Sequence, residues 1–457
     1  MSSSTPFRPH QRSQLLFLPP DMMSWLPEGH LAHFVIDTVS ELDLSEIYST
    51  YDGSKGGQPA YHPEMMVGLL LYAYCTGLPS SRKIERATHE SIPFRVISGD
   101  EHPDHDTIAA FRRRHLEAFS GLFVQVLRLC QEAGLVKLGH VALDGTKVKA
   151  NASKHKAMSY GRMERKATDH QEQVDRLLAE AEATDVAEDE MYGQGKRGDE
   201  LPEDLRHHAT RKKAIRKAMK ALEEEHQAAY PAQRAEYEAK QKAREERGGS
   251  GRPPQPPSET PDPKKQYNFT DPDSRIMKSG DTFVQAYNCQ AAVDQNAQVI
   301  VANSVTQDAN DKQQVEPMVE RILANTQGRK PKKITADSGY FTEDNVTTLQ
   351  QKKIDPYIAT EKFKHGERPP PAPKGRIPKN ATVKERMARK LRTLKGRAIY
   401  SKRKEIVEPV FGQIKECQEF QRFSFRGIKN VTLEWDIVCL SHNLRKLFRH
   451  SWLTQWA

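Results

Sequence analysis

The stretch Val141-Ala-Leu-Asp-Gly-Thr-Lys-Val148 decides how the rest of the chain is interpreted. Its apolar residues and the glycines beside them are typical of a short buried strand. Asp144 interrupts the apolar run, and an acid inside a strand core is unfavourable unless it is paired or holds a metal ion. The alternative is an aspartate just past a strand end that caps a turn, because Asp-Gly favours turns.

Two further acids give the first one a context. Ile334–Tyr340 is again a short strand that ends in an aspartate, Asp337, and a glycine, and Glu408 lies in the helical run Lys404–Lys415. Two strand-end aspartates and one helical glutamate can converge on a pair of divalent cations, a geometry that activates water for phosphodiester hydrolysis. Magnesium suits such hard oxygen ligands. Lys415 follows Glu408 by seven residues, so both lie on one helix face, where one can hold metal while the other grips a phosphate.

Length and composition limit the number of domains and the cellular compartment. A chain of 457 residues is too long for one compact core and predicts two or three domains. No apolar run reaches about 18 residues, and the N-terminus lacks the hydrophobic region of a signal peptide, so we expect no membrane span and a cytoplasmic protein. The five cysteines are scattered without a CxxC pair, which predicts reduced thiols that pack as small apolar residues.

Positive charge is concentrated in one stretch. The net charge is +9, yet Glu361–Lys404 alone holds sixteen Lys/Arg against three Asp/Glu, a local balance of +13. Clustered basic charge near a candidate metal site predicts a polyanionic substrate such as DNA. The alternative is a solvated loop, for which the run Pro369–Pro373 argues.

The N-terminal region from Asp21 to about Glu117 has helical signals throughout. Short helices joined by Gly/Pro turns, with Arg112, Arg113 and Arg114 on one turn, suit a helix-turn-helix-like DNA-binding module. An ordinary helical bundle with a charged face remains the alternative. The His and Asp residues at 102–106 are interpreted as a polar turn and a helix N-cap rather than a metal site.

After Asp144 the strand pattern is interrupted. Residues 160–247 are charged and helix-forming, with a narrow apolar seam and a Gly/Pro-rich linker behind them, and we interpret this block as an insertion. The strands resume at Thr282 with a hairpin through Val305, followed by a helix over Asp308–Leu323, the strand ending at Asp337, and alternating helices and strands. This order predicts an α/β sandwich with a mixed sheet.

Several motifs in this order resemble the DDE-type transposases of bacterial insertion sequences. They are Ala142–Ala152, Thr270–Lys278, Tyr287–Asp294, Ala336–Tyr340 and Val407–Lys415, and the resemblance extends over about residues 15–450. It implies a ribonuclease-H-like fold: a mixed sheet flanked by helices, interrupted by a helical insertion and preceded by an all-α domain. The implied boundaries are a flexible N-terminus (1–20), a DNA-binding domain (21–135), a catalytic domain (136–155 and 265–450) and the insertion (156–264).

The resemblance also implies the chemistry. Asp144, Asp337 and Glu408 would form the acid triad, hold two Mg²⁺ ions (with Mn²⁺ as a substitute), cleave double-stranded DNA at element ends and join the freed 3′-hydroxyl to target DNA. The family's Tyr, Arg, Glu, Lys signature falls on Tyr400, Arg403, Glu408 and Lys415. The Arg-to-Glu interval is one residue longer than usual, so Lys404 is an alternative to Arg403.

Other consequences of the resemblance concern the setting. Related enzymes work as dimers or larger synaptic complexes, and a bacterial enzyme of this kind would act at the nucleoid. Two alternatives stay open from the residues: a metal-dependent nuclease without strand transfer, and a DNA-binding regulator with an inert triad. The motif Thr270-Asp-Pro-Asp273 has no derived role, and a turn entering the hairpin is the simplest interpretation.

Overall fold

A computed structural model describes residues 21–51, 59–153, 156–168, 208–246, 253–280, 282–362, 370–371 and 374–455. The chain divides into two compact units, one comprising residues 1–118 with 448–457 and the other residues 119–447. Each unit is considered by itself below.

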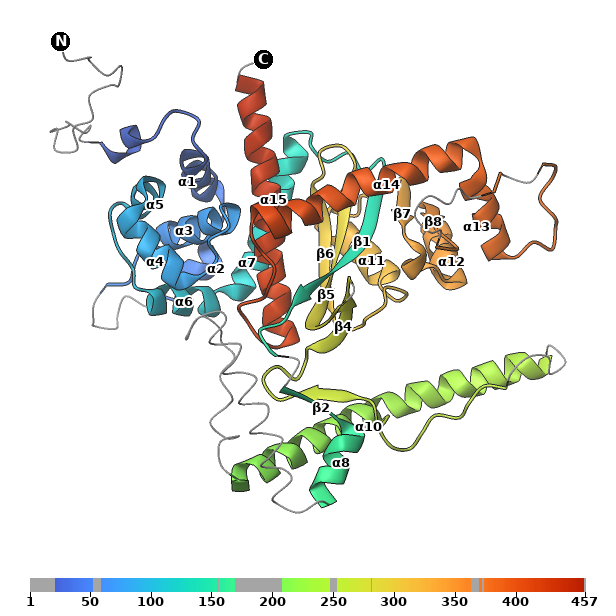
Figure 1. Cartoon of the computed structure of the whole chain (residues 1–457). Coiled ribbons are helices and arrows are strands. Elements are labelled where there is room, and N and C mark those ends of the chain that lie inside the picture. Colours follow the sequence, from blue (N-terminus) through green and yellow to red (C-terminus); the bar gives the residue numbers. More distant parts are fainter. Residues whose placement is uncertain are drawn as a thin grey trace, which may run out of the picture. The chain divides into compact units, whose positions relative to one another are not determined.

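The N-terminal unit is helical where it is described (Figure 1). It contains a 3₁₀ turn at Met22–Trp25 and the helices α1 (Leu31–Glu41), α2 (Ser45–Tyr48), α3 (Pro63–Cys75), α4 (Ser81–Glu90), α5 (Ile92–Ser98) and α6 (His105–Arg114). Helix α3 is central, because eleven of its thirteen residues are buried. Pro63 occupies its first turn, where proline is tolerated because its missing N–H would be unpaired there anyway. Asp104 caps α6 by accepting from the N–H of Thr107, which confirms the predicted N-cap.

The second unit is organised by a mixed six-stranded sheet. Its strands are β1 (Val141–Lys149), β4 (Arg275–Ser279), β5 (Thr282–Asp294), β6 (Ile300–Thr306), β7 (Lys333–Ala336) and β8 (Asp355–Ile358). The order is β4-β5-β1-β7-β8, with β6 also paired to β5. Strand β5 is antiparallel to β1, β4 and β6, whereas β1, β7 and β8 run parallel. The predicted hairpin and mixed sheet are confirmed.

Helices cover this sheet. α14 (Leu394–Gly412) contacts β1, β5, β7 and β8, while α11 (Val315–Asn325) packs on β5 and β6, and α12 (Glu343–Gln351) packs on β8 (Figure 1). α7 (Leu116–Glu132), α13 (Val383–Arg392) and α15 (Ile428–Gln455) complete the unit's main helices. Trp435 of α15 is fully buried and donates its indole N–H to the carbonyl of Gln290 on β5, which fixes this helix to the centre of the sheet.

Between β1 and β4 the chain forms the helical insertion. Its described elements are β2 (Ala157–Ser159), α8 (Tyr160–Thr168), α10 (His208–Glu246) and β3 (Gln266–Asn268). A small core joins them, formed by Tyr160, Met163, Ile215, Ala218 and Leu222 with Met219 packed against it. The narrow apolar seam expected in residues 160–247 is therefore present at Ile215, Met219 and Leu222, whereas its other expected positions, Val174, Leu177 and Leu178, lie outside the described residues.

Two local predictions need correction. Helix α11 begins at Val315 rather than at Asp308, and residues 308–314 form a polar loop instead. Strand β1 does not end at Asp144 but continues through Gly145 to Lys149, paired with β5 along its whole length. Asp144 therefore lies within a strand and does not cap a turn. The free-energy cost of burying its carboxylate has to be offset by other hydrogen-bond or ion-pair partners.

Candidate active site

The two aspartates lie side by side on neighbouring strands. Val141 pairs with Ile334 and Ala142 with Thr335 in the parallel ladder between β1 and β7. Continuing that register by two residues puts Asp144 level with Asp337, the first residue after β7. The charge of Asp337 accordingly raises the pKa of Asp144, in addition to the larger effect of burial. The sheet therefore brings together the two predicted aspartates.

Asp144 has two hydrogen-bond donors. Its Oδ1 accepts from the N–H of Gly145 at 2.9 Å, and its Oδ2 accepts from Nη1 of Arg403 at 2.8 Å. The Asp144 side chain is 19% exposed and that of Arg403 10%, so this ion pair is largely shielded from solvent. Burial raises the pKa of Asp144, and the guanidinium opposes that shift. Arg403 therefore compensates a carboxylate that the strand would otherwise bury alone.

Asp337 is held by the turn that follows β7. Its side chain accepts from the N–H of Gly339 at 2.8 Å and so caps the 3₁₀ turn Ser338–Tyr340. A Cβ on Gly339 would lie 2.9 Å from Oδ1 of Asp337, so the close approach of this carboxylate needs glycine. The predicted strand-end position of Asp337 is confirmed.

Glu408 is exposed on α14, the helix that also supplies Arg403. Five residues separate the two, which turns Glu408 about 140° away from the Arg403 face of an α-helix. Across the described residues, no three His, Cys, Asp or Glu side chains are close enough together to hold a metal ion. The structure thus brings Asp144 and Asp337 together and leaves Glu408 outside their group.

The backbone of α14 is interrupted around Glu408. Pro409 cannot donate to the carbonyl of Glu405, and Nε2 of Gln298, in the β5–β6 turn, donates to that carbonyl at 2.9 Å instead. After Gly412 the helix continues as a π-helical turn, Gln413–Cys417. Such turns occur frequently at functional sites. Lys415 lies in this turn and donates to the carbonyl of Lys147 on β1 at 3.4 Å.

The other predicted signature residues differ in surroundings. Tyr400 is half-buried one turn before Arg403, and burial raises the pKa of its hydroxyl. Lys404 is exposed, as are Lys384, Arg386, Lys395, Arg397 and Lys402 on α13 and α14. Lys390 differs, because its ammonium lies 4.0 Å from the ring centre of Tyr357 and pairs with Asp355. The described part of the basic stretch is therefore mostly a helical basic surface, with one lysine committed to packing.

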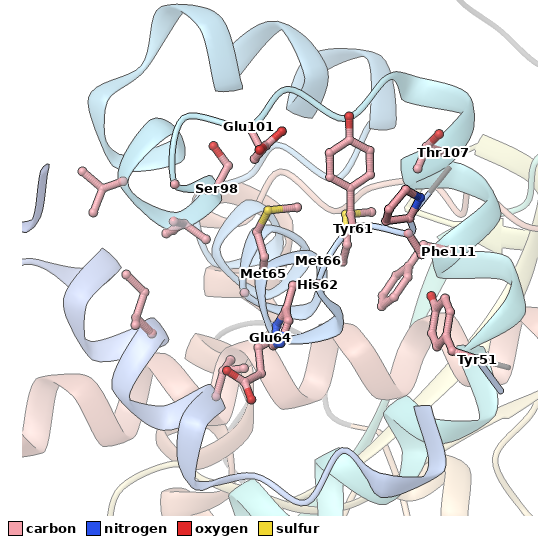
Figure 2. Close-up of a pocket in the computed structure, with 18 of the residues that line it drawn as sticks. Tyr51, Tyr61, His62, Glu64, Met65, Met66, Ser98, Glu101, Thr107 and Phe111 are labelled. Atoms are coloured by element: carbon pink, nitrogen blue, oxygen red, sulfur yellow. The ribbon is translucent and has the colours of Figure 1, made fainter. Parts of the chain in front are cut away.

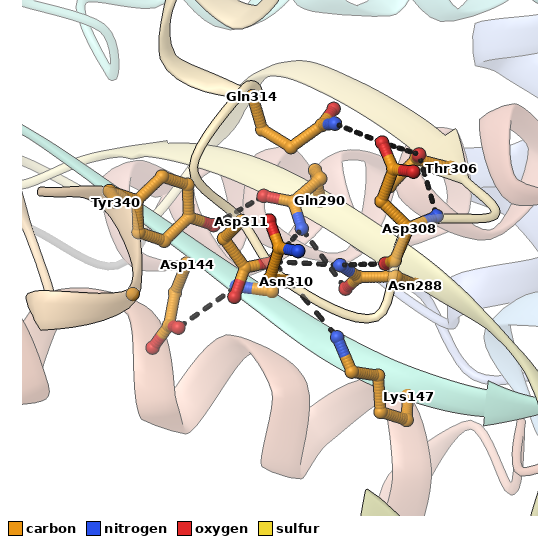
Figure 3. A network of polar contacts seen from close by, with 12 residues as sticks. Asp144, Lys147, Asn288, Gln290, Thr306, Asp308, Asn310, Asp311, Gln314 and Tyr340 are labelled. Atoms are coloured by element: carbon orange, nitrogen blue, oxygen red, sulfur yellow. Dashed lines mark hydrogen bonds and ion pairs between the residues drawn. The ribbon is translucent and has the colours of Figure 1, made fainter. Parts of the chain in front are cut away.

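A second polar cluster adjoins the aspartates (Figure 3). Asp311, from the loop 308–314, accepts from Nδ2 of Asn288 and from Nε2 of Gln290, each at 2.7 Å. Lys147 of β1 lies 4.0 Å from the same carboxylate oxygen. The hydroxyl of Tyr340 donates to Oε1 of Gln290. Sequence reasoning missed this cluster, because it assigned the loop to a helix and treated the polar residues of β5 only as strand positions.

The motif Thr270-Asp-Pro-Asp273 has a structural role beyond forming a turn. Asp271 is fully buried and accepts from the Tyr287 hydroxyl, at 2.8 Å to each oxygen, and from the N–H of Gly427. Asp273 accepts from the N–H of Ile428, at the start of α15. The two aspartates thus cap α15 and fix it to β5, where the insertion rejoins the sheet.

In the N-terminal unit the structure corrects one predicted DNA contact. Arg112 is buried, and its Nη1 donates to the carbonyl of Pro79 at 2.6 Å and to the hydroxyl of Tyr74 at 3.2 Å. It braces the helices from within and does not face a DNA backbone. Its neighbour Arg113 is exposed, so the contact predicted for Arg113 keeps its physical basis.

The same unit contains a cavity of about 1180 Å³. Figure 2 shows Tyr51, Tyr61, His62 and Phe111 among the side chains around it. Among the residues that the structure describes, three acids, Glu64, Glu101 and Asp104, line it together with one basic residue, Arg114. This lining is acidic on balance, so the cavity does not provide the basic surface expected of a DNA-binding face.

Comparison with known families assigns the fold and the site to a class. A family described as "Transposase domain (DUF772)" matches residues 20–114, and one described as "Transposase DDE domain" matches residues 256–444. The second match includes Asp337 and Glu408, and the first covers the N-terminal helices. Neither the curated proteins nor the solved structures that were compared give a match.

The class is thus that of the DDE transposases, with a ribonuclease-H-like catalytic domain. The chain belongs to the insertion-sequence transposases that combine a DUF772 N-terminal domain with a DDE catalytic domain. It is an enzyme of DNA transposition, and it binds DNA. DDE transposases generally use divalent metal ions. None of the described helices is both long and apolar enough to cross a membrane.

Proposed function

We propose that Asp144, Asp337 and Glu408 are the catalytic acids, and that the enzyme cleaves double-stranded DNA at element ends and joins the freed 3′-hydroxyl to target DNA. The observation that carries this proposal is the level placement of Asp144 and Asp337 on adjacent parallel strands. Substrates reach an open sheet at the carboxyl ends of its parallel strands. A basic helical surface on α13 and α14 gives the polyanion its complement.

The donor set fits Mg²⁺, and Mn²⁺ as its substitute. Asp144 and Asp337 supply hard carboxylate oxygens, which magnesium prefers. Two bound ions supply Lewis acidity to the attacking and leaving oxygens. For Asp144 to hold an ion, Arg403 must release Oδ2, because guanidinium and cation compete for the same oxygen. Glu408 must also approach the aspartates, and the interrupted backbone around Pro409 is where we place that adjustment.

The remaining assignments follow from this chemistry. Arg113, Tyr400, Lys404 and Lys415 contact DNA, and Arg403 does so after leaving Asp144. The domain boundaries are those expected from the sequence: 21–135 for DNA binding, 136–155 with 265–450 for catalysis, and 156–264 for the insertion. The enzyme acts at the bacterial nucleoid as a homodimer that synapses two element ends.

The test uses purified protein, Mg²⁺ and a labelled duplex that carries the DNA flanking this reading frame. Asp144→Asn, Asp337→Asn and Glu408→Gln are each expected to abolish nicking and joined products while DNA binding persists. Glu405→Gln is the matched control, since Glu405 is an exposed acid one turn from Glu408 on the same helix. Joined products at wild-type level from Asp337→Asn contradict the proposal. Nicking without joined products favours a nuclease, and binding without nicking favours an inert regulator.

A further inference from the structure

The cluster around Asp311 lies against the two glycines that follow the aspartates, Gly145 within β1 and Gly339 in the turn after β7. A Cβ added to Gly145 would lie 2.4 Å from Nε2 of Gln290 and 2.9 Å from Oδ1 of Asp311. A Cβ added to Gly339 would lie 3.3 Å from Oδ2 of Asp311. The glycine after Asp144 and the glycine two residues after Asp337 therefore leave room for this third carboxylate, which approaches both β1 and the turn after β7.

The carboxylate of Asp311 is rigidly held. Asn288 and Gln290 are 0% and 1% exposed, and both donate their side-chain amides to Oδ1. Gln290 also donates to Oδ1 of Asn288 and accepts from the Tyr340 hydroxyl. Two buried amides that point their donors at one oxygen form a preorganised seat for a negative charge. Burying two polar amides to hold one carboxylate costs free energy. That cost argues for a role of Asp311 beyond holding its own loop in place.

Lys147 is the cation that this seat faces (Figure 3). Its ammonium lies 4.0 Å from Asp311 Oδ1, and the two side chains are 17% and 19% exposed. Burial lowers the pKa of Lys147, whereas the charges of Asp311, Asp144 and Asp337 raise it. Within the described part of the chain, no hydrogen bond joins this ammonium to a protein acceptor. Its three donors are therefore available to a ligand that enters among the carboxylates.

We infer that Lys147 is a further catalytic residue that contacts a non-bridging oxygen of the phosphate being cleaved, and that Asp311 is its positioning residue. This inference rests on the proposed function, because it takes the phosphate to lie at Asp144 and Asp337. The phosphate is the ligand whose chemistry fits: it brings acceptor oxygens to an ammonium that makes no hydrogen bond within the described part of the chain.

The step in which Lys147 acts is hydrolysis at the element end. The water oxygen forms a bond to phosphorus, and the bond from phosphorus to the 3′ oxygen breaks. The water gives up a proton to solvent, and the departing 3′ oxygen takes up a proton to become the hydroxyl. Lys147 stays protonated and stabilises the charge that gathers on the non-bridging oxygens in the transition state. Removing one such preorganised donor typically slows a reaction 10²–10³-fold.

The experiment is a double-mutant cycle on single-turnover cleavage at saturating DNA. Lys147→Met and Asp311→Asn are each expected to slow cleavage about 100-fold, and the double variant is expected to be no slower than Lys147→Met alone. If Asp311 acts only on the fold, the two losses multiply and the inference is wrong. Asp308→Asn is the matched control from the same loop, since its side chain accepts from Thr306 and Gln314 and, among the described residues, makes no bond to Lys147.

A binding measurement without divalent ion gives a second readout. Loss of one phosphate contact in Lys147→Met is expected to reduce the slope of log Kd against log salt by about 1. Lys147→Gln repeats the measurement should Lys147→Met fail to fold, as judged by thermal melting. An unchanged slope together with cleavage within threefold of the wild type overturns the inference. Normal cleavage by Asp337→Asn instead overturns the proposed function, and the binding result then judges the Lys147 contact by itself.

Discussion

Arg403 and Asp144 are 259 residues apart in the chain, and their side chains meet at 2.8 Å in a largely buried ion pair. The pair joins α14 to the middle of β1 and ties the predicted signature helix to the predicted acid. It also means that Oδ2 of Asp144, which the proposed function gives to a metal ion, is hydrogen-bonded to the Arg403 guanidinium in this structure.

The first prediction concerns the coupling of this pair. Arg403→Met is expected to destabilise the protein, because it leaves the Asp144 carboxylate buried beside Asp337 without its cation. Asp144→Asn removes that charge, so the loss shrinks in the double variant. Urea unfolding of the four proteins is expected to give a coupling free energy of roughly 0.5–3 kcal/mol. The control is the same cycle with Lys404→Met in place of Arg403→Met, since Lys404 is the exposed neighbour of Arg403. If the coupling free energy of Arg403 with Asp144 is as small as that of Lys404 with Asp144, the ion pair is ruled out.

Gly145 gives the second prediction. The methyl group of Gly145→Ala would displace the Gln290 amide and the Asp311 carboxylate, which cannot move without breaking buried hydrogen bonds. We expect a loss of roughly 1–3 kcal/mol in the free energy of unfolding and a marked loss of cleavage. Gly139→Ala is the matched control, because nothing lies within 4 Å of the Cβ it would add. Equal stabilities of the two variants, measured by urea unfolding, speak against the tight approach.

Neighbouring arginines in α6 provide the third prediction. Arg112→Met is expected to cost about 1.5–3 kcal/mol of stability, because the partly buried carbonyl of Pro79 and the buried Tyr74 hydroxyl lose a charged donor. Arg113→Met is expected to change stability by less than about 0.5 kcal/mol, since its side chain is exposed. Its effect should appear in DNA affinity and salt dependence. Thermal melting and duplex binding of both variants check this, and the reverse assignment of the two effects refutes it.

The fourth prediction is a pH dependence that arises from Asp436 on α15. Burial raises the pKa of this carboxyl to about 6. The unfolded chain releases the proton near pH 4, so the contribution of Asp436 to stability is present below that pH and is lost as pH rises through about 6. A shift of about two pH units corresponds to roughly 3 kcal/mol. Unfolding of the wild type and Asp436→Asn at pH 4 to 7 is expected to show the difference moving in favour of the variant as pH rises. A constant difference contradicts the buried proton.

Much of the catalytic unit is predictable from local pattern. The apolar runs before Asp144 and Asp337 and the helix that carries Glu408 appear where the residues indicate. The hairpin that starts at Thr282 also appears, with its second strand beginning at Ile300. Period and turn chemistry are local signals, and they suffice for elements of this length.

What could not be predicted depends on contacts between distant segments. Residues 308–314 are compatible with a helix by composition, and only the seat formed by Asn288 and Gln290 makes Asp311 a loop residue beside the active site. Arg112 has the composition of a DNA contact, yet the packing of α3 and α6 buries it. Asn310-Asp311 shortly after a strand was a possible signal, because polar residues that follow strand ends gather at one edge of a sheet.

The bond from Gln298 to the carbonyl that Pro409 leaves open has a mechanical consequence. It joins positions 107 residues apart, and the backbone of Gln298 has a φ of 59°, a left-handed conformation suited to a hairpin turn. This hydrogen bond therefore depends both on the length of the β5–β6 hairpin and on the position of Pro409 in α14. Lengthening the hairpin by one residue, or moving the proline by one, would remove the hydrogen bond that satisfies the Glu405 carbonyl.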